Sequence, residues 1–352
     1  MRTRGRLPIR TAVLVATAIA ASACQVGRQP APVGVRFLQV GEVARATDRA
    51  ALSPIAWSPD GTRFAYGGRD GVWVHHLGDS AGRKIAEGSA VTAVAWSRAA
   101  NALAFVDRGS LWIVHPDGRS SRRVPVAGLV TLPVWAPGGD RLAFVVRPPG
   151  GPARLWITSP DGALLRMIAW DPRDRTVSAL GWFPDALHLF VGLAVHATQT
   201  TTEWWRVRIA YPDVRRLAGP PRPALESALS PDGAWVAFVA QEGDHERAYV
   251  VRADGSGLHP VSGAARRIAG ASWAPHGDKV AYAVLRSDGV AEIYVAATPG
   301  VARLQVTTYR LEFPDPAAGL SLAWSPDGRR LAYGTNTGAM AGPVWLATFR
   351  ER

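Results

Sequence analysis

The chain has 352 residues, of which 47% are hydrophobic and 19% charged, and its formal net charge is +12. Its single cysteine excludes internal disulfides and cysteine-based metal sites, and 36 Gly with 27 Pro fit a turn-rich globular protein. Beyond the N-terminus, no stretch is apolar for long enough to span a bilayer.

Residues 1–23 have the features of a lipoprotein signal peptide. Residues 11–21 form a short apolar core, which follows a basic region with Arg2, Arg4, Arg6 and Arg10. The segment that ends in Cys24 resembles the lipobox of bacterial lipoproteins, whose cysteine is acylated. An ordinary cleavage site beside an incidental cysteine is the alternative. We expect lipidation at Cys24, an exported protein anchored on the extracytoplasmic side of the cell membrane, and therefore no nucleic-acid partner.

Residues 24–33 are rich in Pro, Gly and Gln and are expected to be a flexible tether. Residues 35–40 follow as a candidate strand. No turn motif of the kind that organises the rest of the chain precedes this strand.

One pattern then repeats along the chain. Its first copy is the turn Trp57-Ser58-Pro59-Asp60-Gly61, in which proline presets φ and Asp-Gly tolerates positive φ. Each copy begins at a residue that we call the anchor: Trp57, Trp96, Trp135, Trp182, Leu229, Trp273 and Trp324. The seventh residue after every anchor is large and apolar, and the mean spacing is (324 − 57)/6 = 44.5 residues. That period is typical of four-stranded propeller blades.

A third strand follows in each copy, marked by Trp73, Trp112, Trp156, Trp205, Tyr249, Tyr294 and Trp345. Candidate outer strands are residues 123–126 and 302–306. The last copy ends soon after its third strand, so we expect residues 35–40 to pair with residues 344–346 and close the last blade. The sequence thus predicts an all-β chain with one seven-bladed propeller over residues 34–352, expected to be monomeric, with six or eight blades as alternatives.

The Trp-Ser-Pro-Asp-Gly turn, followed by a strand of the Leu-Ala-Tyr type, resembles the WD40-like (PD40) repeat of bacterial TolB propellers. The resemblance covers about residues 34–350 and implies membership of a TolB-like family of β-propeller lipoproteins. TolB's propeller has six blades, whereas this chain has seven copies of the repeat.

No motif for metal, phosphate or nucleophilic chemistry has the required spacing, so we expect no cofactor and no metal. The turn residues Asp60, Asp185, Asp232 and Asp327 are expected to bond the backbone and not to act in catalysis. Most of the 14 Trp residues are expected to pack between blades, with a Trp-rich binding site as the alternative. Only Trp170 and Trp235 fall outside the repeat pattern.

Function in a propeller is expected in the longer, variable loops between second and third strands and between blades, which share one face. We call this face the variable face. Its candidate binding residues are Arg147, Arg154, Trp170, Arg173, Arg175, His196, Arg222, His245, Arg266, Arg267, Arg286, Tyr309 and Arg310. Arginine with aromatic residues is typical of interfaces, while a solvated rim with arginine set by codon usage is the alternative.

These patterns favour a non-catalytic binding or scaffold protein of the cell envelope that recognises a protein or an anionic ligand. The alternative is a propeller enzyme that acts on glycans as a hydrolase or lyase, which needs clustered carboxylates or histidines near the centre. The loops offer Asp244, His245, Glu246 and Asp288 for such a role. A propeller that assists a peptidase in trans is a third possibility.

Overall fold

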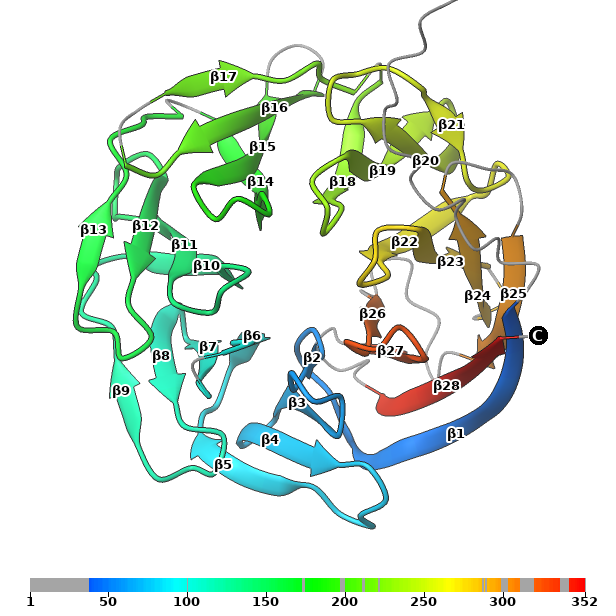
Figure 1. Ribbon diagram of the computed structural model, residues 1–352, viewed down its shortest axis with the longest axis horizontal. Helices are drawn as coiled ribbons and strands as arrows, with labels where there is room; N and C mark the ends of the chain where they lie inside the picture. Colours follow the sequence, from blue (N-terminus) through cyan, green and yellow to red (C-terminus); the bar gives the residue numbers. More distant parts are fainter. Residues whose placement is uncertain are drawn as a thin grey trace, which may run out of the picture. The chain divides into compact units, whose positions relative to one another are not determined.

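The computed structural model describes residues 38–99, 101–172, 175–196, 200–210, 213–220, 222–286, 288, 290–298, 303–310, 320–335 and 342–351. All described residues belong to one compact unit within residues 32–352. Every regular element among them is a β-strand. The strands form seven antiparallel four-stranded sheets, which follow one another around a ring (Figure 1). The predicted all-β, seven-bladed propeller is confirmed.

Blades 1 to 4 each consist of four strands that are consecutive in sequence. Blade 1 contains β2 (Ala56–Trp57), β3 (Arg63–Gly68), β4 (Gly71–His76) and β5 (Arg83–Glu87). Blade 2 contains β6 (Val91–Trp96), β7 (Leu103–Asp107), β8 (Ser110–Val114) and β9 (Ser121–Arg123). Blade 3 contains β10 (Leu129–Trp135), β11 (Leu142–Arg147), β12 (Arg154–Thr158) and β13 (Leu165–Met167). Blade 4 contains β14 (Thr176–Trp182), β15 (His188–His196), β16 (Thr200–Arg208) and β17 (Val214–Arg216).

Blades 5 and 6 keep this order, whereas blade 7 takes its outer strand from the start of the described chain. Blade 5 contains β18 (Ala224–Leu229), β19 (Trp235–Glu242), β20 (His245–Arg252) and β21 (His259–Pro260). Blade 6 contains β22 (Arg267–Trp273), β23 (Lys279–Leu285), β24 (Val290–Ala297) and β25 (Arg303–Arg310). Blade 7 contains β26 (Leu320–Trp324), β27 (Arg330–Thr335), β28 (Pro343–Glu351) and β1 (Leu38–Ala50).

The N-terminal strand closes the last blade, as predicted, but its length and register differ from the expectation. Strand β1 pairs antiparallel with β28, so that Leu38 faces Glu351 and Ala44 faces Leu346. Residues 344–346 therefore oppose the middle of β1 and not residues 35–40, of which 35–37 lie outside the described residues. The Thr47 hydroxyl extends the closure by accepting a hydrogen bond from the Val344 N–H at 3.0 Å.

The anchors end the inner strands and fix the register of every blade. Each anchor faces the seventh residue after it, in the pairs Trp57–Phe64, Trp96–Leu103, Trp135–Leu142, Trp182–Leu189, Leu229–Val236, Trp273–Val280 and Trp324–Leu331. The second member of every pair has an exposed fraction of 0%. The repeat therefore encodes both a turn and the buried contact beneath it.

The outer strands are less regular than predicted. In blade 2 the outer strand is Ser121–Arg123 and not residues 123–126, because Val124 turns into the core and Pro125 has no N–H for the ladder. In blade 6 the outer strand begins at Arg303, close to the prediction, and continues to Arg310. The aromatic third strands are all confirmed.

The core lies between neighbouring blades. Inner strands of consecutive blades contact one another, and β2 of blade 1 contacts β26 of blade 7, which completes the ring. Trp235, which did not fit the repeat, begins β19 and is buried in the cluster between blades 5 and 6. In the part of the chain that the structure describes, no helix has the length and apolarity needed to cross a bilayer.

Candidate functional site

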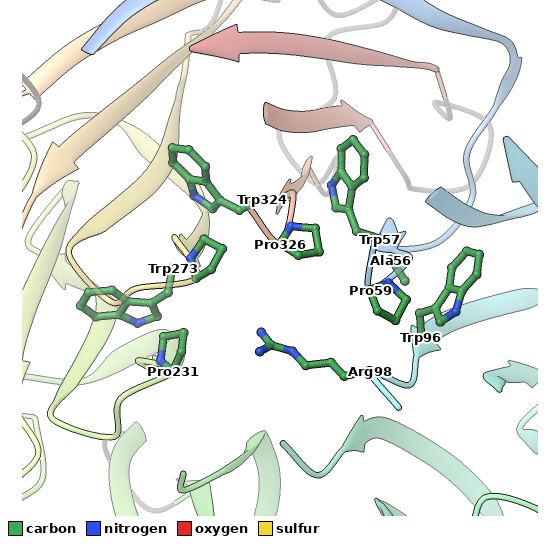
Figure 2. Close-up of a pocket in the computed structure, with 10 residues that line it drawn as sticks. Ala56, Trp57, Pro59, Trp96, Arg98, Pro231, Trp273, Trp324 and Pro326 are labelled. Carbon is green, nitrogen blue, oxygen red and sulfur yellow. The ribbon is translucent and has the colours of Figure 1, made fainter. Parts of the chain in front are cut away.

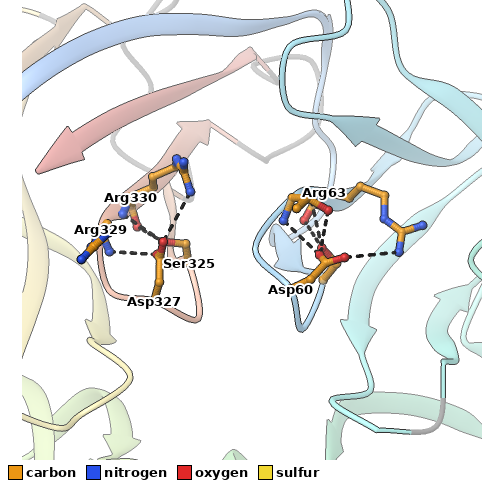
Figure 3. A network of polar contacts seen from close by, with 8 residues as sticks. Asp60, Arg63, Ser325, Asp327, Arg329 and Arg330 are labelled. Atoms are coloured by element: carbon orange, nitrogen blue, oxygen red, sulfur yellow. Dashed lines mark hydrogen bonds and ion pairs between the residues drawn. The ribbon is translucent and has the colours of Figure 1, made fainter.

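The turn between the inner and second strand of each blade is held by its own side chains. In blade 1 the Ser58 hydroxyl accepts from the Arg63 N–H at 2.9 Å and donates to Asp60 Oδ1 at 2.5 Å (Figure 3). Asp60 Oδ1 also accepts the Thr62 N–H at 3.0 Å. The Ser58 hydrogen bond is the main cause that lowers the pKa of Asp60 to about 2. This carboxylate is therefore ionised and occupied within its turn.

The other turn carboxylates that the sequence singled out also accept hydrogen bonds from backbone N–H groups of their own turns. Asp185 accepts the Leu187 N–H at 2.9 Å, Asp232 accepts the Ala234 N–H at 3.0 Å, and Asp327 accepts the Arg329 N–H at 3.0 Å. Figure 3 shows the blade 7 turn, in which Ser325 and Asp327 repeat the arrangement of blade 1. The prediction that these residues bond the backbone is confirmed.

The anchor tryptophans connect neighbouring blades through their indole N–H groups. Each acceptor is the backbone oxygen of the residue before the preceding blade's anchor, in the pairs Trp57–Ala323, Trp135–Ala95, Trp182–Val134, Trp273–Ala228 and Trp324–Ser272 at 2.9–3.2 Å. Trp96 breaks this belt, because its buried Nε1 has no hydrogen-bond partner among the described residues. Leu229, the anchor of blade 5, has no N–H to donate.

These turns surround an opening of about 470 Å³, which we call the turn opening (Figure 2). Its walls are four anchor indoles and four turn prolines, together with Ala56 and Arg98: Trp57, Trp96, Trp273, Trp324, Pro59, Pro231, Pro275 and Pro326. Figure 2 shows the guanidinium of Arg98 extending across the opening towards Pro231. The side chain of Arg98 is exposed, and no ion pair to it occurs among the described residues. The side chains that line the opening are thus indole and proline rings with one cation, while its exposed surface is shared between polar and apolar atoms.

Arg98 reaches this position because the turn of blade 2 closes without the usual residues. The Ser97 N–H still donates to the Ala102 oxygen at 2.9 Å, as the Ser58 N–H does to Arg63 at 2.8 Å. Asn101 adopts a left-handed conformation at φ 45°, one position later in the repeat than Gly61 of blade 1 at φ 66°. The loss of proline therefore changes the side chain that faces the opening but not the closure of the turn.

Four arginines predicted for the variable face are each paired with a carboxylate. Their partners are Asp171 for Arg154 at 2.5 Å, Glu203 for Arg175 at 2.7 Å, Glu242 for Arg222, and Asp288 for Arg286 at 3.0 Å. Arg222 also donates to the Tyr249 hydroxyl at 3.0 Å. The structure brings these arginines to neighbouring acids and does not gather them into one basic cluster.

The remaining candidates of the variable face are more scattered. Arg147 lies 3.5 Å from the Thr176 hydroxyl, and Trp170 is half-buried against Trp205 with ring centroids 6.0 Å apart. His245 and Arg266 are exposed, while Arg267 is half-buried. Arg173 lies outside the described residues, as do the side chains of His196, Tyr309 and Arg310.

Glu226 is a carboxylate that the sequence did not single out. It lies on the inner strand β18, and its Oε2 accepts the Gly270 N–H of blade 6 at 3.1 Å. The protein atoms around it desolvate the carboxylate and raise its pKa, although part of the side chain reaches solvent. Glu246, whose Oε2 accepts the Ile268 N–H at 2.6 Å, adds to the rise. No pattern in the sequence marks this pair, since its members come from different strands.

In the described ranges, no group of three or more His, Cys, Asp or Glu side chains is placed to hold a metal ion. What the structure presents is a closed ring with an opening lined by indole and proline rings and Arg–carboxylate pairs among the loops. Such an arrangement can bind a ligand, hold it in position and exclude water from it.

Residues 207–333 are similar to the family model of the lipoprotein LpqB β-propeller domain. This stretch runs from β16 to β27, about a third of the chain. It supports a lipoprotein-type β-propeller, and the finer resemblance to TolB stays a prediction. No curated protein matches the chain.

Among solved structures, an oligogalacturonate lyase in complex with manganese has a TM-score of 0.66 and 13% identity, covering 89% of this chain and 97% of that one. The Cps50 (Swd1) β-propeller domain of Myceliophteria thermophila has a TM-score of 0.62 and 16% identity, covering 88% of this chain and 99% of that one. At these identities the likeness shows the propeller fold alone.

Proposed function

We propose that this protein is a non-catalytic binding protein of the cell envelope, exported and anchored by a lipid on Cys24. The similarity to a lipoprotein β-propeller domain supports the envelope location. The basic and apolar leader that ends at Cys24 supports lipidation, although residues 1–37 lie outside the described structure. Its partner is a protein or an anionic ligand on the same side of the membrane.

The observation that carries the proposal is the turn opening. Indole N–H bonds between blades hold its walls, so the surface is formed before any ligand arrives and little ordering entropy is lost on binding. Tryptophan and arginine are the residues that interfaces enrich. The variable face, with its paired arginines, would supply a polar second surface whose charges a partner would have to match.

The same residues argue against glycan hydrolysis at this opening. A general acid must hold a proton near its working pH, yet the pKa of Asp60 is lowered to about 2 by its turn. The pKa of Glu226 is raised. This residue lies on β18, the inner strand of blade 5, and one of its carboxylate oxygens accepts the Gly270 N–H. Asp60 stabilises its own turn, and Glu226 joins blade 5 to blade 6 through the Gly270 N–H; the proposal assigns chemistry to neither.

Capture of partners from envelope extracts tests the proposed function. The full chain with a C-terminal tag is cross-linked in cells and purified, beside a variant with Arg154→Ala and Arg175→Ala that alters the variable face. We expect a small set of envelope partners that the double substitution reduces. Depolymerisation of polyuronate or peptidoglycan by the purified protein, abolished by Glu226→Gln, would overturn the non-catalytic proposal.

A further inference from the structure

One position of the repeated turn differs in blade 2 alone. The second residue after the anchor is proline in six blades, at Pro59, Pro137, Pro184, Pro231, Pro275 and Pro326, and arginine in blade 2. Four of these prolines line the turn opening together with Arg98. The exception therefore places a long cationic side chain where the other described turns present an uncharged ring (Figure 2).

Among the described residues, no ion pair joins Arg98 to an acid of a neighbouring turn. Asp232, beside Pro231, uses its Oδ1 to accept the Ser230 hydroxyl and the Ala234 N–H. Asp60 is held by Ser58 and lies 3.9 Å from the guanidinium of Arg63 (Figure 3). Asp327 lies 3.5 Å from the guanidinium of Arg330. The turns of blades 1 and 7 thus each contain both an acid and its counter-ion, and among the described residues Arg98 has none. A guanidinium against apolar walls attracts an anion more strongly than one in bulk water.

A second irregularity lies on the same blade, two residues before Arg98. Trp96 has an exposed fraction of 7%, yet its indole N–H has no acceptor among the described residues, unlike those of the five other anchor tryptophans. A buried donor without an acceptor is unfavourable, so among the described residues blade 2 lacks a bond that the other tryptophan anchors make to the preceding blade. Both irregularities belong to residues of blade 2 that line the turn opening.

We propose that the turn opening binds the carboxylate of an extended peptide segment, with Arg98 as its counter-ion. This inference rests on the proposed binding function and names the chemistry of the ligand. One guanidinium matches one carboxylate in charge and in planar, bidentate geometry, whereas a phosphate dianion would remain half unbalanced. The proline rings and indole edges suit the apolar part of a peptide, and about 470 Å³ lies in the usual range for ligand sites.

Nuclear magnetic resonance of the Arg98 side chain tests the proposal. The probe is N-acetyl-phenylalaninate, which joins a carboxylate to an apolar body, and its matched control is N-acetyl-phenylalaninamide. The protein carries Cys24→Ala so that it can be handled without lipid. We expect a saturable shift of the Arg98 Nε–H resonance with the carboxylate and none with the amide. Binding to the Arg98→Gln variant should be about ten- to a hundredfold weaker.

Two further variants separate binding from folding. Arg98→Pro installs the residue that six other turns carry, so it should preserve the thermal melt and abolish binding. Arg83→Gln removes an exposed arginine of β5, away from the opening, and should change neither. An unsaturated shift, an equal response to the amide, or unchanged binding by Arg98→Gln would each overturn the proposal.

The source of the carboxylate is decided by a third probe, N-acetyl-glutamic acid α-amide, which carries its carboxylate on the side chain. Preference for N-acetyl-phenylalaninate assigns a chain terminus, and preference for the glutamate derivative assigns an acidic side chain. If no carboxylate binds while envelope partners are still captured, this inference fails and the proposed function stands. If binding occurs but no partner is captured, the site stands without the scaffold role.

Discussion

Replacing Trp135 by phenylalanine should destabilise the protein more than the same change at Trp96. Both side chains end an inner strand and are almost equally buried, with exposed fractions of 8% and 7%. The Trp135 indole N–H donates to the Ala95 oxygen at 3.0 Å, whereas that of Trp96 has no described partner. The two substitutions remove similar apolar area, and their difference isolates the bond between blades.

The expected magnitude follows from this difference. The loss of apolar contact and the residual cavity affect both variants and largely cancel. Losing the Trp135 hydrogen bond costs about 0.5–1.5 kcal/mol, while removing an unpaired buried donor at Trp96 relieves a penalty of about 1–3 kcal/mol. Arg63 stacks on the Trp96 ring at 5.2 Å and can stack on phenylalanine as well. The two effects add, so we expect W135F to be less stable than W96F by about 1.5–4.5 kcal/mol.

Urea unfolding followed by far-UV circular dichroism measures this difference, provided that both variants unfold with the same slope. Trp182→Phe is a matched replicate, because its indole N–H donates to the Val134 oxygen at 3.0 Å. It should behave like W135F. Equal losses at all three positions would refute the reasoning, since the bonds between blades would then contribute nothing measurable.

Four other outcomes are expected. Deleting residues 38–50 removes the outer strand of blade 7 and should lower the melting temperature sharply; a near-unchanged melt would contradict the closure. Cys24→Ala should move the protein from the membrane to the soluble fraction, and unchanged fractionation and mass would exclude lipidation. The folded pKa of Asp60 is lowered to about 2, so its contribution to stability is present above pH 3.8 and lost as the pH falls towards 2. Asp60→Asn should therefore weaken the loss of unfolding free energy between these pH values, as measured by chemical unfolding. Desolvation raises the pKa of Glu226, so its contribution to stability is present below pH 4.5 and lost as the pH rises. Glu226→Gln should therefore gain stability relative to the parent at pH 7 and not at pH 4. An equal difference at both pH values would contradict the assignment.

The inner and second strands could be predicted from the sequence because they carry its strongest signals. The anchor, the turn and the seventh residue are all buried or conformationally restricted, so the residue types allowed there are few. Outer strands lack this constraint: Ser121, Arg122 and Arg123 of β9 are all exposed, and nothing in their pattern marks a strand. Strand β1 was underestimated for the same reason, since most of its 13 residues are not buried.

The site was harder to predict because its chemistry depends on partners distant in sequence. Arg175 and Glu203 are 28 residues apart, and no local pattern shows that the arginine is already paired. Arg98 was visible only as a lost proline in a degenerate repeat. The ring brings turns that are about 45 residues apart in sequence around one opening. For this reason the sequence alone does not show that the arginine extends across that opening.

The closure of blade 7 also sets when the chain can finish folding. The Leu38–Glu351 pair joins residues 313 positions apart, for which loop closure alone costs about 5 kcal/mol of chain entropy. Strand β28 lies between β1 and β27, so a chain without its last nine described residues has two unpaired strand edges. Until the C-terminal residues are in place, these open edges should leave the chain accessible to proteases. Early stop codons near the end of the gene should therefore remove the protein from the cell and not merely shorten it.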